Sequence, residues 1–271
     1  MSSINTIVVD KLARLIGTPR CPIVIDCRTA EDYAADPRLI PSSVRREHAG
    51  APEWERDMTS PAVVVCQQGR KLSQGVAAWL RATGVEAESL DGGYEAWLAA
   101  GQPVVNTARL PPRNTAGQTV WVTRERPKVD RVACPWLIRR FIDTSAVFLF
   151  VSPAEVEAVA SRFSATPFDV EGVFWSHRGE TCTFDTMIEE FALKSAPLLQ
   201  LAKIVRGADT ARPDLTPQSE GLLAASLGYS RMYRDDLPQL EAAMGFYDAF
   251  YRWCRDATEE THNWPSTKPK A

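Results

Sequence analysis

Short apolar runs alternate with amphipathic stretches in the first part of the chain. Strand-like runs occupy residues 23–26, 61–66 and 86–90, and a helix-like pattern covers residues 73–81. Strands that alternate with helices along a sequence are typical of an α/β domain with a parallel sheet. The pattern therefore predicts a small parallel-sheet domain within residues 1–105.

The regular pattern lapses after this first region. Prolines, glycines and polar residues replace the periodic apolar positions between residues 101 and 118. Breakers of this kind mark loops and linkers, so residues 106–118 are predicted to form a linker. A second domain is expected over residues 119–265, and the polar residues 266–271 are expected to form a flexible tail.

The second region is predicted to be a mainly helical α+β domain. It begins with a strand-like run at 119–123, and Pro135 suits the first position of a helix over residues 135–142. Two strand-like pieces flank a turn at 178–180, and helical patterns begin near positions 186, 219 and 237. The last helix has one apolar face with spacings of three and four, formed by Leu237, Leu240, Met244, Tyr247, Tyr251 and Cys254.

The composition adds limits on partners and location. The chain has 271 residues, 45% hydrophobic and 24% charged, which is enough for two domains with apolar cores. Its net charge of −3 gives no positive field for a polyanion, so nucleic acid is not expected as a partner. No apolar run could span a bilayer and residues 1–14 lack a secretory pattern, so we expect no membrane partner and a cytoplasmic protein.

Cys66 ends a strand-like run and begins a short loop that leads into a helical pattern. In such an arrangement, backbone N–H groups at the helix start can lower the pKa of the thiol and stabilise an anionic persulfide. Gly69 permits a tight turn, and two basic residues add positive charge for an anionic sulfur donor. Cys66 is therefore the candidate catalytic residue, and the candidate substrate-binding residues are Gln67, Gln68, Gly69, Arg70 and Lys71.

These loop residues resemble the active-site loop of the rhodanese family of sulfurtransferases. Three other segments resemble motifs of that family: Val-Ile-Asp-Cys-Arg at 24–28, Leu-Ile-Pro at 39–41 and Leu-Asp-Gly-Gly-Tyr-Glu-Ala-Trp at 90–97. The resemblance implies a rhodanese-like fold and a Cys66 persulfide that carries sulfur from thiosulfate or a persulfide donor to a thiol acceptor, with no cofactor required. Lys71 stands where the family commonly has Arg, which weakens the case for thiosulfate in particular.

Other interpretations of Cys66 remain open at this point. It could be a buried structural thiol or part of an inactive, regulatory rhodanese-like domain, although neither interpretation explains the basic loop. A phosphatase loop is disfavoured because Leu72 occupies the position of the required Arg. Asp26 and Arg28 are expected to form a structural ion pair. Cys27 lies between them and is expected in the core, with a role as resolving thiol for Cys66 left open.

A second group of reactive residues lies in the predicted helical domain. Cys134 directly precedes Pro135 and is expected at a helix N-cap, where the dipole favours a thiolate. His177 and Cys182 flank a turn and could converge as ligands of zinc or iron. Further candidates, of which the arginines suit an oxyanion such as chromate, are Asp130, Arg131, Cys134 and Arg178. A buried cysteine, a satisfied histidine and salt-bridged arginines fit the same sequence equally well.

These segments, with residues 204–209 and 251–255, resemble the C-terminal domain of the chromate-resistance protein ChrB over about residues 119–258. The resemblance implies a link with chromate resistance. We therefore predict a cytoplasmic sulfurtransferase coupled to a metal- or oxyanion-binding domain and acting in chromate or thiol stress resistance. The alternative is a chromate- or redox-responsive sensor or regulator with a catalytically weak rhodanese domain.

Overall fold

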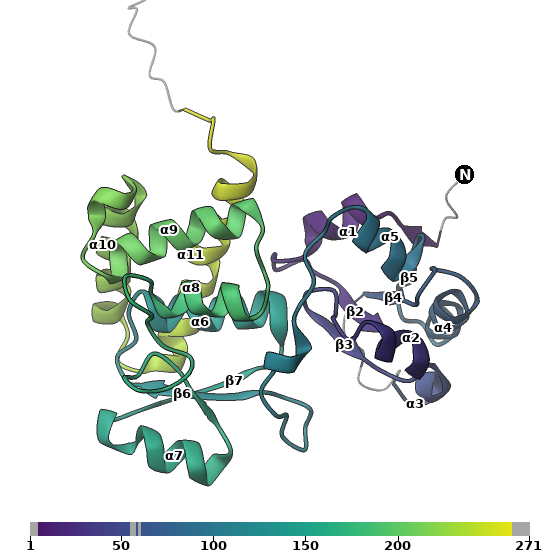
Figure 1. Ribbon diagram of the computed structural model, residues 1–271, viewed down its shortest axis with the longest axis horizontal. Coiled ribbons are helices and arrows are strands. Elements are labelled where there is room, and N and C mark those ends of the chain that lie inside the picture. Colours follow the sequence, from purple (N-terminus) through teal and green to yellow (C-terminus); the bar gives the residue numbers. More distant parts are fainter. Residues whose placement is uncertain (1–4, 55–57, 59–60, 262–271) are drawn as a thin grey trace, which may run out of the picture.

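The computed structural model describes residues 5–54, 58 and 61–261, and these form two regions that lie side by side (Figure 1). The first region contains a five-stranded sheet in which every described pairing is parallel. In spatial order its strands are β1 (Thr6–Ile7), β5 (Ala87–Leu90), β4 (Ala62–Val65), β2 (Ile23–Asp26) and β3 (Ser43–Arg45). The accompanying helices are α1 (Val9–Leu15), α2 (Ala30–Ala35), α3 (Ala51–Trp54), α4 (Lys71–Ala82) and α5 (Gly93–Ala99).

The central strands of this sheet are apolar on both faces because helices cover both. Ile25 and Val64 belong to the core cluster that includes α4, whereas Val24 and Val63 belong to the cluster that includes Trp97 of α5. Because β2 and β4 are parallel neighbours, their carboxyl ends meet at one edge of the sheet, between two helical layers. The loop that follows β4 begins at this edge.

The second region has a smaller parallel sheet and more helix. Strand β6 (Val120–Arg124) pairs with β7 (Val147–Val151) on one side and with β8 (Thr166–Pro167) on the other. Figure 1 shows α7 on one side of this sheet and the remaining helices on the other. The helices of this region are α6 (Asp130–Leu137), α7 (Val156–Phe163), α8 (Thr183–Glu190), α9 (Ala196–Asp209), α10 (Gln218–Met232) and α11 (Asp236–Asp256). The predicted fold class, a parallel-sheet domain followed by a helix-rich α+β domain, is confirmed.

Local predictions in the second region need correction. The helix predicted to start at Pro135 starts at Asp130, so Pro135 lies inside α6. A π-helical segment, Ile138–Ile142, follows directly, and the Asp143 N–H bonds to the Ile138 carbonyl at 2.8 Å. The strand-like pieces around 178–180 form no regular strands among the described residues, only isolated bridges of Arg178 with Thr181 and of Trp175 with Phe168.

The two regions share one apolar core cluster, which contains Leu12 and Trp97 from the first and Phe141 from the second. Backbone hydrogen bonds join the regions as well: the Ser42 N–H donates to the Phe141 carbonyl at 2.6 Å, and the Asn106 N–H donates to Phe191 at 3.1 Å. The first residue of the predicted linker thus contacts the helical domain directly. The predicted tail, 266–271, lies outside the described residues. Among the described helices, none is long and apolar enough to cross a membrane.

Candidate active site and candidate metal centre

Cys66 lies directly after β4, at the carboxyl edge of the first sheet. Residues 66–70 join β4 to α4, so the strand–loop–helix arrangement expected from the sequence is present. The Cys66 residue is only 5% exposed, and its Sγ lies 3.1 Å from the hydroxyl of Ser73, in the first turn of α4. The sulfur is therefore held beside a helix start, where backbone N–H groups have no partner within the helix.

Two glycines allow this loop to pack against the start of α5. Gly69 and Gly93 both have positive φ, and a Cβ on Gly93 would overlap the carbonyl oxygen of Cys66 and the amide of Gly69. The Tyr94 N–H donates to the Cys66 carbonyl at 3.0 Å, and the Glu95 N–H donates to Gln67 at 3.0 Å. The segment at 90–97 therefore packs against the Cys66 loop and holds it by backbone hydrogen bonds. Only glycine at position 93 permits so close an approach of the two backbones.

The loop presents its polar side chains outward. Gln68, Arg70 and Lys71 are exposed, and Gln67 is half-buried with its Nε2 bonded to Glu95 at 3.2 Å. No ion pair within the described part of the chain involves Arg70 or Lys71. Both cations are thus available to an anionic substrate.

Asp26 and Arg28 form the structural ion pair expected from the sequence. Their side chains are almost fully buried and 2.7 Å apart. Arg28 also donates to two backbone carbonyls, of Asp36 and Arg38, and its guanidinium stacks 3.8 Å from the Tyr94 ring centroid. All of these contacts are internal, so this pair braces the carboxyl edge of the sheet rather than facing a substrate.

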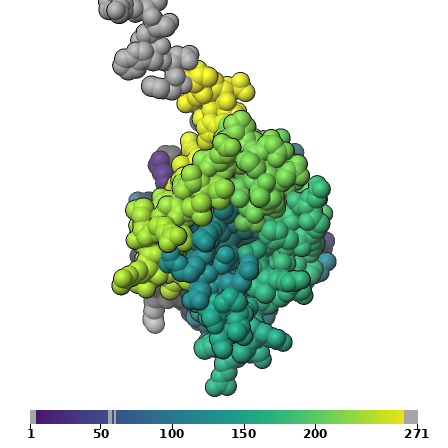
Figure 2. All heavy atoms as spheres, turned by 90° about the vertical axis from the view of Figure 1, so that its left-hand side faces the viewer, coloured from purple at the N-terminus to yellow at the C-terminus, as the bar shows by residue number. Residues whose placement is uncertain are grey.

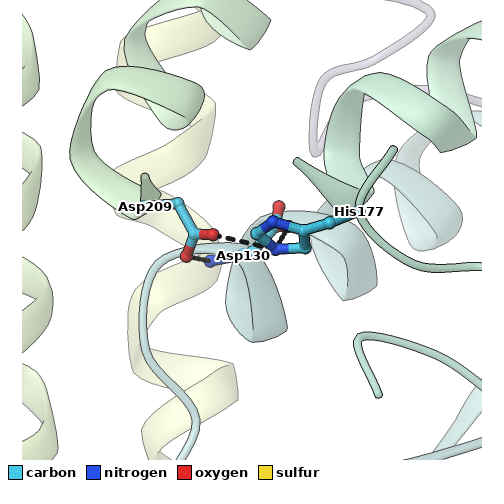
Figure 3. Close-up of side chains that lie close together, drawn as sticks. All are labelled: Asp130, His177 and Asp209. Atoms are coloured by element: carbon cyan, nitrogen blue, oxygen red, sulfur yellow. Dashed lines mark hydrogen bonds and ion pairs between the residues drawn. The ribbon is translucent and has the colours of Figure 1, made fainter. Parts of the chain in front are cut away.

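The second region brings a histidine among three carboxylates. The His177 Nε2 lies 3.1 Å from Asp209, 3.3 Å from Asp169 and 3.6 Å from Asp130. Figure 3 shows the imidazole entering from one side, with the carboxylate of Asp209 opposite and Asp130 overlapping the imidazole in this view. One ligand atom from each of Asp130, His177 and Asp209 lies within 4.8 Å of the others, so these three residues form a candidate metal-ligand group.

Helix ends fix the carboxylates of this cluster. Asp130, at the start of α6, accepts the backbone N–H groups of Thr183 at 2.6 Å and Phe184 at 3.0 Å, at the start of α8. Asp209 ends α9 and accepts the Asp130 N–H at 3.4 Å. Asp169 accepts the Thr183 hydroxyl at 2.9 Å. Backbone N–H groups at helix starts favour a negative charge, so they hold Asp130 in place although it is completely buried.

The cluster has a strong preference for a cation. Hydrogen bonds to Asp169 and Asp209 raise the pKa of His177 to about 10, although its partial burial opposes this. Burial, followed by the charges of Asp209 and Asp169, raises the pKa of Asp130 above its ordinary value. These carboxylates therefore attract either the imidazole proton or a metal ion that replaces it.

The site is open to solvent on the side of His177, whose side chain is 40% exposed. Figure 2 looks onto the second region, where dark teal atoms from its first segment lie between the yellow-green C-terminal helices and the green middle of the chain. Because the histidine is partly exposed while Asp130 is buried, an ion could enter from the His177 side.

The two candidate cysteines of this domain, Cys134 and Cys182, do not have the roles expected from the sequence. Cys134 is not an N-cap, because α6 begins four residues earlier; it is fully buried, and burial raises its pKa well above the ordinary value. Its Sγ lies 3.7 Å from Asp130. Cys182 is the N-cap of α8, and its Sγ bonds to Asp185 at 3.3 Å. The expectation of a Cys134 thiolate is therefore wrong, and Cys182 is not part of the metal-ligand group of Asp130, His177 and Asp209.

The arginines considered for an oxyanion site are already paired with acids. Arg131 lies 3.3 Å from Asp169, and Arg178 lies 2.6 Å from Glu190. Arg139, in the π-helical segment of the same domain, pairs with Glu241. Because these cations are engaged by carboxylates, the geometry favours a cation at this site over an oxyanion such as chromate.

Comparison with known proteins agrees with this division into two regions. The family model for the rhodanese-like domain matches residues 8–100, and the model for ChrB, C-terminal domain, matches residues 121–254. The chain is a fusion of a rhodanese-like domain and a ChrB-like domain. Protein ChrB of Cupriavidus metallidurans is 32% identical over 145 residues, which are 51% of this chain and 43% of ChrB. The chain thus spans less than half the length of that relative.

Solved structures similar to the rhodanese-like domain come from several organisms. A rhodanese-related protein from Thermoplasma volcanium is 20% identical and covers 37% of this chain and 97% of its own, with a TM-score of 0.33. A thiosulfate sulfurtransferase from Pseudomonas aeruginosa is 29% identical and covers 39% of this chain and 20% of its own, with a TM-score of 0.32.

The ChrB-like domain contains two functional candidates that the sequence prediction missed, Asp169 and Asp209. Asp209 lies within the segment 204–209 that carried the resemblance to ChrB, so the motif pointed to it without giving it a role. Asp169 had no comparable signal. Only the folding of α6, α8 and α9 against one another places these carboxylates around His177.

Proposed function

We propose that the rhodanese-like domain is a sulfurtransferase that carries sulfane sulfur as a persulfide on Cys66. The observation that carries this proposal is the position of Cys66 at the carboxyl end of β4, in a loop that leads into α4 and rests on Gly93. The exposed cations of the loop, Arg70 and Lys71, support the choice of an anionic donor such as thiosulfate or a low-molecular-weight persulfide.

The reaction has two displacements. The Cys66 thiolate attacks the sulfane sulfur of the donor, a new S–S bond forms, and the donor leaves as sulfite or as a thiolate. A thiol acceptor then attacks the outer sulfur of the persulfide and returns Cys66 to its thiolate. The loop binds the anionic part of the donor, and neither step requires a cofactor.

The test is sulfur uptake and turnover by the full chain. After treatment with thiosulfate, mass spectrometry of the wild-type protein should find one added sulfur on Cys66. Cys66→Ser should take up none and should lose turnover at least a hundredfold, because a hydroxyl does not hold sulfane sulfur at neutral pH. Cys254→Ser, which alters a thiol in α11, is the matched control and should retain both properties. Uptake by Cys66→Ser would contradict the assignment.

For the ChrB-like domain we propose a divalent metal site formed by Asp130, His177 and Asp209, with Asp169 beside it. The observation that favours it is the convergence of these side chains from separate helices and loops onto one point. One imidazole nitrogen with carboxylate oxygens suits iron, zinc or manganese, and the absence of a thiolate from this group favours the harder ions among them.

Metal binding can be measured by calorimetry with Mn²⁺ and Zn²⁺ on the full chain. His177→Ala and Asp209→Asn should each weaken binding at least tenfold. Asp214→Asn, which changes an exposed carboxylate outside the cluster, should bind like the wild type. Equal affinities in all four proteins would exclude the site.

We infer further that the fusion acts in chromate or thiol stress resistance, since its second half is similar to ChrB. Cells that lack the chain should then grow less well with chromate, and Cys66→Ser should fail to restore growth. If turnover with both thiosulfate and persulfide donors is negligible while metal or chromate alters binding of a partner, the protein is instead a chromate- or redox-responsive regulator.

A further inference from the structure

Cys27 and Cys66 follow two neighbouring strands of the rhodanese-like sheet. Strands β2 and β4 are parallel, with Asp26 opposite Val65. The pairing continues past the strands, because the Cys27 N–H donates to the Val65 carbonyl at 2.8 Å. Cys27, the residue directly after β2, therefore lies alongside the end of β4, where the Cys66 loop begins.

Both side chains lie on the same face of the sheet. Side chains alternate along a strand, and Ile25 and Val64, two residues earlier, share a core cluster with both cysteines. Val24 and Val65 point to the opposite cluster. Neighbouring strands lie about 4.8 Å apart, and a disulfide requires Cα atoms roughly 4.4–6.8 Å apart. The backbone thus places these two thiols at a spacing that a disulfide can bridge.

The electrostatics agree with this proximity. Burial raises the pKa of Cys27 to about 12, and the second largest cause is the neighbouring Cys66. Cys27 is completely buried. A reagent in solvent therefore has little access to Cys27, whereas a sulfur atom on Cys66 lies beside it.

We propose that Cys27 is the resolving thiol of the Cys66 persulfide, an inference that rests on the sulfurtransferase function proposed above. The Sγ of Cys27 attacks the Sγ of Cys66, and a Cys27–Cys66 disulfide forms. The bond between the Cys66 Sγ and the sulfane sulfur breaks, and this sulfur leaves as hydrosulfide with the proton of Cys27. The sulfane sulfur gains two electrons, which the two cysteines supply. An external dithiol then reduces the disulfide and is itself oxidised.

This step is slow compared with transfer to an acceptor. Attack requires a thiolate, and a thiol with so high a pKa is almost entirely protonated at neutral pH. An acceptor thiol therefore takes the sulfur when one is present. When no acceptor thiol is present, Cys27 releases the sulfur as sulfide, and a dithiol supplied afterwards reduces the Cys27–Cys66 disulfide. The sum of these steps converts thiosulfate and the dithiol into sulfite, sulfide and the oxidised dithiol.

The test loads the full chain with thiosulfate, removes the donor and withholds any thiol. Wild-type protein should first gain one sulfur on Cys66, then release about one equivalent of sulfide per chain while peptide mapping finds a Cys27–Cys66 disulfide. Cys27→Ser should keep the persulfide and release less than a tenth of that sulfide. Cys254→Ser, the control, should behave like the wild type.

The possible results separate the two proposals. A wild-type persulfide that persists without sulfide or disulfide overturns the role of Cys27 and leaves the sulfurtransferase intact, as does equal sulfide release from Cys27→Ser. A wild-type protein that takes up no sulfur overturns both. Because Cys27→Ser alters a buried position, a second measurement uses the wild type alone: one equivalent of the oxidant diamide should join Cys27 to Cys66, and a disulfide of Cys66 with any other cysteine contradicts the proposal.

Discussion

The two candidate sites have opposite electrostatic character. The Cys66 loop holds a sulfur atom and two exposed cations without acidic partners in the described ion pairs, and it suits an anion. The site of the ChrB-like domain holds three carboxylates and one imidazole, and its arginines are paired, so it suits a cation. One chain thus offers a loop whose charge suits an anion in one domain and a cluster whose charge suits a cation in the other.

The sites also differ in how the chain builds them. The loop at 66–71 is contiguous, and one other segment, 90–97, supports it. The metal-ligand group combines Asp130 with Asp209, which is 79 positions away in the sequence. A contiguous site tolerates little change in its own backbone, whereas a dispersed site depends on the packing of several helices. The predictions below exploit this contrast.

The largest expected effect comes from Gly93→Ala. A methyl group there overlaps the Cys66 carbonyl and places alanine at positive φ, so the loop must move. Sulfur uptake should fall at least a hundredfold while Mn²⁺ affinity is unchanged. Gly75→Ala, at an open position of α4, is the control and should retain uptake. Normal uptake by Gly93→Ala would show that the loop does not need this support.

The next effect is the pH dependence of metal binding. The pKa of His177 without metal is about 10, so a bound ion must displace a proton at neutral pH. Mn²⁺ affinity should therefore rise about tenfold per pH unit between roughly pH 6.5 and 8.5, and calorimetry in buffers of different ionisation enthalpy should detect about one released proton. Affinity that does not vary with pH would mean that His177 is not a ligand. Sulfur uptake at Cys66 should not show the pH dependence that His177 gives to metal binding.

A smaller effect is expected from Lys71→Ala. The exposed ammonium contributes long-range attraction, so KM for thiosulfate should rise about threefold at low salt, with less change for an uncharged sulfur donor. Added salt should reduce the difference between wild type and variant. Equal losses for both donors would indicate that Lys71 shapes the loop instead of attracting charge. Metal affinity should be the same in both proteins.

Sequence patterns predicted the strand–loop–helix arrangement around Cys66 correctly because its parts are local. The strand, the Cys66 loop and the following helix are consecutive in the sequence. Gly92 and Gly93 stand in a recognisable motif, and both have a backbone conformation that favours glycine. The second site was predicted less well. Cys134 was placed at a helix start because Pro135 favours that position, but α6 begins about one turn earlier, at Asp130, whose carboxylate accepts N–H groups at the start of α8.

By itself, the sequence determined the two-part architecture, the parallel sheet, most of the apolar face of α11 and the position of Cys66, because each follows from residues close together in the chain. Leu237 was wrongly assigned to that apolar face: it lies in the first turn of α11 and is 50% exposed. The tertiary structure alone decided which acids surround His177, and that Cys27 lies beside Cys66 rather than merely in the core. Both depend on packing between segments far apart in sequence. Local propensity carries no information about such distances, whereas strand register and helix–helix contacts fix them.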